Sequence, residues 1–349
     1  MENMSYLSYK LTDTLSFTGI SPMNTAASIA LLSACPFVSL AAVPVTFSET
    51  VLEAAGPKGP LKGTLLTPNS KPTAVVLIIP GSGPTDRDGN NPLGVNASPY
   101  RLLAEGLAAK GFATLRIDKR VMFASAMAVE DGNAVTMADY VDDVRSWVEV
   151  LRRQMHASCI WVLGHSEGGV VALASAQEED LCGVVLIATP GRPMGEVLRG
   201  QLYANPENEV LLKQALPIID ALEHRRRVDI SNMHPALQNL FNPGVQGFLI
   251  NAFSYNPGQL ISRISKPVLV LQGLRDLQVE ETDARLLKAA NPQASLIILP
   301  DMNHVMKEVT SDDIKANIAS YAEPALPLAP GLIDSIEHFL IHNSPFPEK

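Results

Sequence analysis

The chain has 349 residues, which is enough for one large domain or two modest ones. Hydrophobic residues make up 46% of the chain and charged residues 18%, a composition typical of a globular protein with a substantial core. The formal net charge of −9 argues against nucleic acid or an anionic membrane surface as the main partner.

The first part of the chain has the pattern of an export signal. Residues 1–22 are polar, whereas residues 23–42 form an uncharged apolar segment that is too short, and too interrupted by Pro36, for a stable membrane span. The small residues before Ala42 suit signal-peptide cleavage, which predicts a periplasmic or secreted protein. No positive charge precedes the apolar run within this segment, so a buried N-terminal helix of a cytoplasmic protein stays open. A lipoprotein-type box that would lipidate Cys35 is a further alternative.

Beyond this segment, apolar runs of strand type alternate with amphipathic helical segments. The later strands are continuous apolar runs, as expected for parallel strands that are covered on both faces. The expected strands are 45–54, 61–68, 74–80, 113–118, the run that starts at 160, and 181–189. The expected helices are 100–110, 137–154 and the segment that follows residue 168. The alternation predicts an α/β fold, with a mostly parallel sheet and helices on both faces.

The alternation stops at Pro190 and resumes later. Residues 191–265 contain no strand-like run, but they contain helical segments at 195–202, 207–226 and 235–253, which resemble an inserted cap. Two further strands, an irregular connection and a final amphipathic helix are expected at 267–272, 295–299, 305–330 and 331–342. The predicted organisation is an N-terminal extension at 1–44, a core at 45–190 and 266–349, and a helical cap at 191–265. Substrates bind at such caps above the carboxyl edge of a sheet.

The stretch 160–173 has the order of a nucleophile elbow. It starts as an apolar strand, passes through Gly-His-Ser-Glu-Gly and continues as a helix. The turn would expose the hydroxyl of Ser166 above the sheet. Gly164 and Gly168 flank it because a side chain at either position would collide with neighbouring backbone. We therefore expect Ser166 to be a nucleophile.

Serine is a weak nucleophile unless a histidine accepts its proton and a carboxylate holds that histidine. Asp276 follows the strand at 267–272, and His304 follows the strand at 295–299. Because the carboxyl ends of parallel strands share one edge of a sheet, these side chains can converge on Ser166. The chain order Ser166, Asp276, His304 is the one used with this kind of elbow.

Other residues are weaker candidates for these roles. Asp301 precedes His304 in the same loop and is expected to be a turn residue. His165 adjoins the serine, but adjacent side chains on so tight a turn point apart. The remaining histidines are expected at the solvated surface: His156, His224, His234, His338 and His342.

An oxyanion hole needs two backbone amides. We expect one from Glu167, which follows the nucleophile, and the other from Ser82, with Gly83 as the second choice, in the loop after the strand at 74–80. The Asp-Arg-Asp cluster at 86–88 in the same loop could bind a polar group or form an ion-pair network that braces the loop.

With these residues identified, residues 45–345 resemble the α/β-hydrolase family, and most of all its bacterial esterase branch of serine-aminopeptidase-like and dienelactone-hydrolase-like enzymes. The motifs that carry the resemblance lie at 80–89, 164–169, 273–276 and 303–304. The resemblance implies an α/β-hydrolase fold with an inserted helical cap. It also implies a two-step reaction, in which an acyl-enzyme forms on Ser166 and is hydrolysed by water activated through His304.

Two motifs depart from the family pattern. The oxyanion loop begins with Pro80-Gly81 where the family has His-Gly, a histidine that is generally structural. After the fourth strand the family tends to have Asp-x-Arg-Gly-x-Gly-x-Ser, but here Val121 and Phe123 replace the two glycines. We expect this replacement to alter the backbone of the loop and to place apolar bulk at the rim of the site.

The prediction is a serine carboxylic-ester hydrolase that acts on a small-molecule ester with short to medium acyl groups. The alternatives are a peptidase or amidase on the same fold, and a non-catalytic member that binds a ligand. Candidate pocket residues are Met122, Phe123, Tyr203, Phe253 and Tyr255, although ordinary core or cap packing is the favoured interpretation of each.

The three cysteines show no metal-ligand spacing, and no phosphate loop or dinucleotide fingerprint is present, so no metal or cofactor is expected. Cys159 and Cys182 stand at the start of two successive strands that should be neighbours. A disulfide is conceivable in an exported protein, but buried free thiols are favoured.

Overall fold

The computed structural model describes residues 47–176, 181–204 and 209–344. The segment 23–42, with Cys35, lies outside the described residues, so the predicted export signal is not described. No helix among the described residues is both long and apolar enough to cross a membrane.

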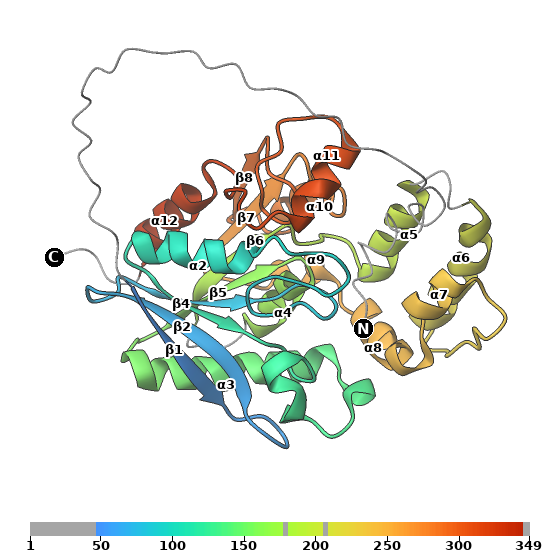
Figure 1. Ribbon diagram of the computed structural model, residues 1–349, viewed down its shortest axis with the longest axis horizontal. Helices are drawn as coiled ribbons and strands as arrows, with labels where there is room; N and C mark the ends of the chain where they lie inside the picture. The colour runs from blue at the N-terminus through green and yellow to red at the C-terminus, as the bar shows by residue number, and fades with distance from the viewer. Residues whose placement is uncertain (1–46, 177–180, 205–208, 345–349) are drawn as a thin grey trace, which may run out of the picture.

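One sheet organises the described chain (Figure 1). Its eight strands are β1 (Phe47–Ala54), β2 (Leu61–Pro68), β3 (Val75–Ile79), β4 (Ala113–Ile117), β5 (Ile160–His165), β6 (Leu181–Ile187), β7 (Val268–Gly273) and β8 (Ser295–Leu299). They are hydrogen-bonded in the order β1-β2-β4-β3-β5-β6-β7-β8. β2 runs antiparallel to β1 and β4, and all pairs from β4 to β8 are parallel. The predicted mostly parallel sheet is therefore confirmed.

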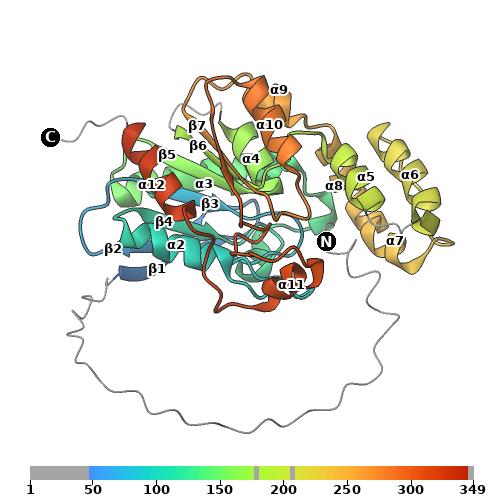
Figure 2. The ribbon, with the colours of Figure 1, turned by 90° about the horizontal axis from the view of Figure 1, so that it is seen from above.

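Helices cover both faces of the sheet (Figure 2). Those of the core are α2 (Pro99–Ala109), α3 (Met137–Met155), α4 (Glu167–Ser175), α10 (Glu281–Ala290), α11 (Ile314–Ala319) and α12 (Leu332–His342). Apolar side chains of α2 and α12 form a buried layer on one face. Those of α3, α4 and α10 form the buried layer on the other face. The central strands lie between two apolar layers, which explains their continuous hydrophobic runs.

Helix α3 shows how the local sequence sets these elements. A capping box starts it, because the Thr136 side chain accepts from the Asp139 amide while the Asp139 carboxylate accepts from the Thr136 amide. Its buried stripe includes Val144, Trp147 and Leu151 at helical spacing.

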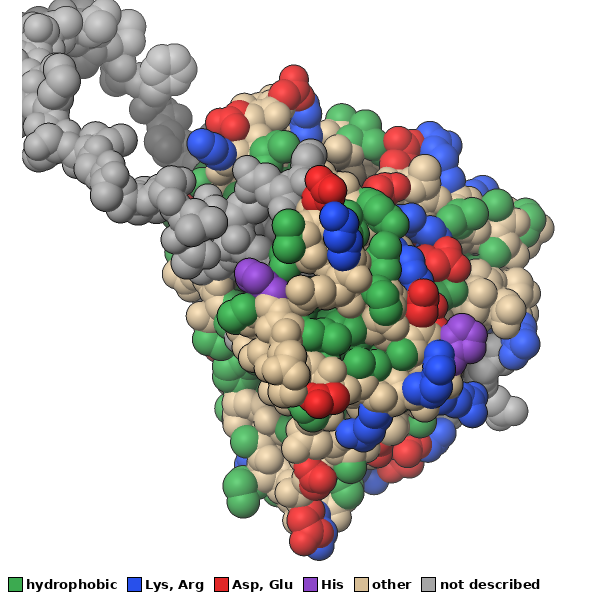
Figure 3. All heavy atoms as spheres, turned by 90° about the vertical axis from the view of Figure 1, so that its right-hand side faces the viewer, with side chains coloured by type: hydrophobic (Ala, Val, Ile, Leu, Met, Phe, Trp, Pro, Cys, Tyr) green, Lys and Arg blue, Asp and Glu red, His purple; other side chains and the backbone are tan. Residues whose placement is uncertain are grey.

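Between β6 and β7 the described residues form five helices, α5 (Met194–Ala204), α6 (Glu209–Glu223), α7 (Pro235–Leu240), α8 (Pro243–Phe253) and α9 (Pro257–Ile261). Helices α5 to α8 project to one side of the sheet (Figure 1). Figure 3 views the molecule from that side, where patches of hydrophobic side chains lie between acidic and basic ones.

Three details of the predicted elements were wrong. The single helix expected at 235–253 is two helices, because the Asn242 side chain caps the amide of Gly244 and Pro243 starts a new helix. The connection at 305–330 was expected to be irregular but contains α11. Helix α10 was not predicted at all.

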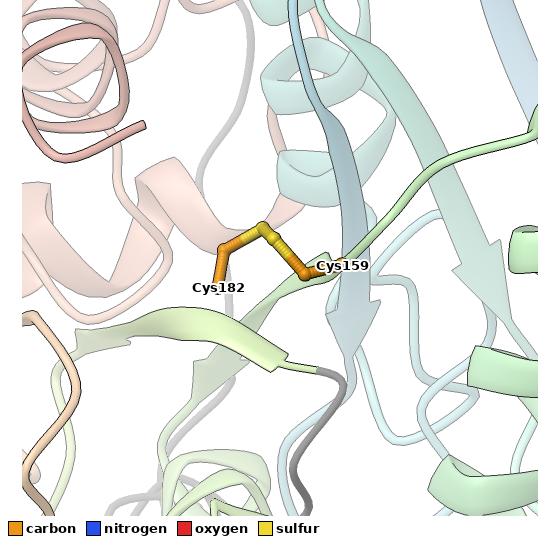
Figure 4. The surroundings of a disulfide bond; sticks show 2 residues. All are labelled: Cys159 and Cys182. Atoms are coloured by element: carbon orange, nitrogen blue, oxygen red, sulfur yellow. A yellow bond between two sulfur atoms is a disulfide. The ribbon is translucent and has the colours of Figure 1, made fainter. Parts of the chain in front are cut away.

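Cys159 and Cys182 form a disulfide (Figure 4), so the expectation of buried free thiols was wrong. Both residues are only partly buried. Ile160 pairs with Leu181 but Trp161 pairs with Gly183, so Cys182 is the extra residue of a bulge in β6. The two Cα atoms lie 5.2 Å apart, within the range that a disulfide spans.

Candidate active site

Ser166 lies on a sharp turn between β5 and α4. Its backbone adopts φ 54° and ψ −123°, a conformation that L-residues rarely take and that costs about 1–3 kcal/mol. The surroundings hold it there, because the Ser166 amide donates to the carbonyl of Ile187 over 2.9 Å. A Cβ atom at Gly164 would collide with the backbone of Gly168, and one at Gly168 would collide with the backbone of Ile79. The turn therefore requires both glycines.

His304 is held by a carboxylate from the neighbouring loop. Its Nδ1 lies 2.9 Å and 3.1 Å from the two carboxylate oxygens of Asp276. The same carboxylate accepts from the amides of Gln278 and Val279, at 2.8 Å and 2.9 Å. The side chains of His304 and Asp276 are 6% and 1% exposed. Because a carboxylate only accepts, Nδ1 carries the proton, and Nε2 of a neutral His304 is left as an acceptor.

The sheet brings these residues to one edge. Ser166 follows β5, Asp276 follows β7 and His304 follows β8. Ser166 and His304 line the same pocket, together with Ser82 of the loop after β3. Asp301 lies in the turn after β8, where its backbone carbonyl accepts from the amide of Val309.

The loop that follows β3 is tied to the elbow by polar contacts. The Ser82 hydroxyl donates to the Glu167 carboxylate over 3.1 Å. Nζ of Lys119 donates to the carbonyl of Gly81 over 2.6 Å and lies 3.7 Å from the Glu167 carboxylate. Burial lowers the pKa of Lys119, although the charge of Glu167 opposes this shift. Gly83 turns the loop with φ 71°. The backbone amides of Ser82 and Glu167 stay predicted oxyanion donors.

His165 has a structural setting that sequence reasoning missed. Its Nε2 donates to the carbonyl of His304 over 2.8 Å, so its Nδ1 accepts, over 2.8 Å, from the hydroxyl of Tyr100. That hydroxyl in turn accepts from the amide of Gly81 over 3.0 Å. Burial, and then the charge of His304, lower the pKa of His165 to about 3, so the ring stays neutral. One hydrogen-bonded chain thus joins the oxyanion loop, the elbow and the histidine loop.

Ser166 and Ser82 together line two pockets that are formed by the described residues. The first has a wall of mixed polarity that includes His304 and Gln278. The second has a mostly apolar wall, contributed mainly by the cap helix α5 and by two residues outside it. The lining residues of this wall are Pro190, Met194, Val197, Leu198, Gln201 and Val279.

None of the five pocket residues predicted from the sequence lines either of these pockets. Met122 and Phe123 line a separate cavity. Tyr203 is 59% exposed, and Phe253 is 7% exposed and packs in the core. Tyr255 is partly buried against the same core. Tertiary packing decides which residues face Ser166, and the sequence pattern alone does not reveal it, so the role of these five residues in the substrate pocket stays a prediction.

The loop after β4 adopts a backbone that favours glycine at two positions. Val121 and Phe123 have φ 66° and 45°, in the left-handed region that favours glycine. Both residues thus adopt a backbone region that glycine adopts without cost, and the predicted difference from the family's loop stays a prediction. The Asp118 carboxylate fixes the loop, because it accepts from the Ala124 amide and from the amide and guanidinium of Arg87.

The charged cluster at 86–88 is an internal network. Arg87 pairs with Asp118, and Asp88 pairs with Arg116, so the bracing alternative holds. The five histidines expected at the surface are all exposed. Within residues 47–176, 181–204 and 209–344, no group of three or more metal-ligating side chains is placed to hold a metal ion.

Comparisons with known proteins agree with this architecture. Residues 93–308, more than half of the chain, match the family described as serine aminopeptidase, S33. The chain is 28% identical over 267 residues to esterase EstD of Thermotoga maritima, covering 75% of this chain and 61% of that protein. It is also 28% identical over 193 residues to human monoglyceride lipase, covering 50% of this chain and 62% of the lipase. The chain thus spans about three fifths of the length of these relatives.

The fold is similar to that of solved esterase structures. Est1E from Butyrivibrio proteoclasticus superposes with a TM-score of 0.51 at 14% identity, covering 84% of this chain and 98% of that one. Together with the extent of the family match, the sheet order and the elbow assign the family. The chain belongs to the serine aminopeptidase S33 family of α/β hydrolases.

Proposed function

We propose that this protein is a cofactor-free carboxylesterase that uses Ser166, His304 and Asp276 as a catalytic triad. The observation that carries the proposal is that Ser166, on its strained turn, and His304, hydrogen-bonded to Asp276, line one pocket. The similarity to EstD, which is named an esterase, supports the same reaction.

The reaction follows from the protonation states. Nε2 of His304 accepts the hydroxyl proton as Oγ of Ser166 attacks the ester carbonyl, and it then donates that proton to the leaving alcohol. The Asp276 carboxylate stabilises the imidazolium that forms between these steps. The amides of Ser82 and Glu167 stabilise the negative charge on the carbonyl oxygen. Water, activated through His304, then hydrolyses the acyl-enzyme.

We infer that the substrates carry short to medium acyl groups. The apolar wall from α5 would hold the acyl chain, while the pocket beside His304 would release the alcohol. A panel of p-nitrophenyl esters of increasing acyl length would locate the optimum.

Ser166→Ala tests the triad. It should lower kcat for p-nitrophenyl butyrate by at least about 10⁴-fold while the melting temperature stays within a few degrees. A serine-directed phosphonate should label the wild type at Ser166 and leave the variant unlabelled. Retained turnover in the variant would refute the role of Ser166, and an unlabelled, inactive wild type would favour a non-catalytic binding protein.

A peptidase or amidase is the second candidate, because the family description names an aminopeptidase. An aminopeptidase needs a carboxylate for the substrate ammonium. The carboxylate among the lining residues of the two Ser166 pockets is that of Glu167, which already contacts Ser82 and Lys119. We therefore favour esters. Faster hydrolysis of an aminoacyl p-nitroanilide than of the matching ester would reverse this ranking.

We also propose that the protein is exported. The disulfide between Cys159 and Cys182 supports an oxidising compartment, where such bonds persist. The mass of the mature protein from its native host distinguishes cleavage before Ala42, lipidation of Cys35 and an intact N-terminus.

A further inference from the structure

A cavity of about 330 Å³ lies between the cap and the core, apart from the two pockets that contain Ser166. Its size falls in the range of ligand pockets. Helix α8, the loop after β4 and the loop after β3 form its walls. The lining residues are Pro84, Pro92, Val121, Met122, Phe123, Gly132, Asn133, Gly244, Val245 and Phe248. No charged side chain is among them, so the cavity suits an apolar group.

Two of the lining residues, Val121 and Phe123, have an unfavourable backbone conformation. Val121 and Phe123 have φ 66° and 45°, which costs an L-residue about 1–2 kcal/mol each. Glycine would give the same backbone without the cost, but it would also remove the wall. Phe123 remains 45% exposed, so it adds little to the core in return. Strained residues of this kind cluster at ligand sites.

A short series of side-chain contacts runs from the cavity wall to Glu167, the neighbour of the nucleophile. The ring of Phe248, in the cavity wall, packs edge-on against Tyr140 at 5.9 Å. Nζ of Lys119 lies 5.5 Å from the Tyr140 ring and 3.7 Å from the carboxylate of Glu167, the neighbour of Ser166. On another side, Pro84 of the cavity wall is two residues from Ser82, which lines both Ser166 pockets.

We propose that this cavity binds an apolar arm, alkyl or aryl, of the ester that Ser166 attacks, and that Val121 and Phe123 determine specificity for it. The inference rests on the proposed esterase function. The arm belongs to either the acyl or the alcohol part of the ester, and both have the same apolar chemistry.

Two variants change the cavity in opposite ways. Phe123→Gly opens the cavity wall. It should keep the fold, because glycine adopts the positive φ at this position without the free-energy cost that phenylalanine pays. Val245→Phe, from helix α8, fills the cavity. Met127→Ala is the matched control, because Met127 lies in the same segment, is 80% exposed and does not line the cavity. Melting temperatures of all three exclude unfolding.

The readout is kcat/KM along two series, p-nitrophenyl acyl esters from acetate to decanoate and acetates of alcohols from ethanol to decanol. In one of the two series, Phe123→Gly and Val245→Phe should each lower the ratio of kcat/KM for the long substrate to kcat/KM for the short one. The expected decrease is about tenfold or more, because two methylenes lose their burial. Met127→Ala should leave both ratios unchanged. Unchanged ratios in both cavity variants, or equal losses on short and long esters, would overturn the inference.

Direct binding separates the inference from the proposed function. Calorimetry with 1-decanol should show binding to the wild type and weaker binding, about tenfold or more, to Val245→Phe. If the wild type hydrolyses no ester but shows this difference, the esterase proposal fails and the apolar site stands. If decanol binds both proteins equally, the apolar site fails even when esters are hydrolysed.

Discussion

The hydroxyl of Tyr100 donates to Nδ1 of His165 over 2.8 Å, which joins helix α2 to the turn that carries Ser166. The other ring nitrogen of His165 binds the backbone carbonyl of His304. The nucleophile loop and the histidine loop are therefore set relative to one another by a buried neutral imidazole. Tyr100 and His165 act as positioning residues, since they reach the chemistry through other groups.

Tyr100→Phe tests this arrangement. It leaves Nδ1 of His165 and the amide of Gly81 without the partner they share, which should cost about 1–3 kcal/mol of stability. We expect kcat to fall about tenfold with little change in KM, because the loops that carry Ser166 and His304 are no longer held in a fixed position relative to one another. Tyr140→Phe is a matched control, since the buried hydroxyl of Tyr140 has no hydrogen-bond partner among the described residues. Equal effects of the two changes on kcat would contradict a positioning role.

The pKa of His165 predicts an acid-labile fold. Its value is about 3 in the folded protein and about 6.5 in the unfolded chain. Between these values protons bind the unfolded chain preferentially, so stability is fully present above pH 6.5 and is lost as the pH falls toward 3. The contribution of this residue is up to about 1.4 kcal/mol per pH unit. Urea unfolding at several pH values should show a shallower decline for His165→Gln, and parallel curves would refute this assignment.

Lys119→Met should be strongly destabilising. It leaves the buried carboxylate of Glu167 without its cation and the carbonyl of Gly81 without a donor. Loss of one partner of a buried pair costs about 3–5 kcal/mol. Chemical denaturation measures this cost. The double variant Lys119→Met with Glu167→Gln should recover part of it, because no unpaired charge remains. If the double variant is as unstable as Lys119→Met alone, the unpaired charge of Glu167 is not the cause of the destabilisation.

Removal of the disulfide should lower stability without changing chemistry. Cys159 and Cys182 are separated by 23 residues, and a loop of that length gives about 3 kcal/mol in the chain-entropy estimate. We expect the Cys159→Ser, Cys182→Ser double variant to melt several degrees lower and to keep kcat for a short ester, since the bond lies at the start of β5 and the nucleophile follows its end. Wild type treated with dithiothreitol should match the variant. A melting temperature insensitive to both treatments would contradict the prediction.

The regular part of the fold was predictable because each central strand is a continuous apolar run. Helix α10 was not, because its inward face carries Asp283 beside Ala284 and Leu287. The Asp283 side chain is fully buried and pairs with the guanidinium of Arg192. This pairing lets an aspartate occupy a core position, and it breaks the hydrophobic period that marks a helix in the sequence.

At the candidate site, Ser166, Asp276 and His304 could be predicted because each follows a strand end. The chain from Gly81 through Tyr100 to His165 could not, because Tyr100 lies 65 residues before His165 and only the folded sheet brings them together. The left-handed backbone of Val121 and Phe123 was equally hidden, since neither residue favours it. The Asp118 carboxylate accepts from the amide of Ala124, directly after Phe123, and such a tertiary contact is not visible in the local sequence pattern.

Strands β5 and β6 are fastened at both ends. The disulfide between Cys159 and Cys182 joins their starts, and the bond from the Ser166 amide to the Ile187 carbonyl joins their ends. We therefore expect local opening of β5 to require nearly global unfolding, and the cap helices, which project to one side of the sheet, to open more readily. In native-state hydrogen exchange, the amides of β5 should be among the last to exchange and those of α6 and α7 among the first. On gentle heating, the enzyme should therefore lose its preference among substrates before the turn that carries Ser166 unfolds.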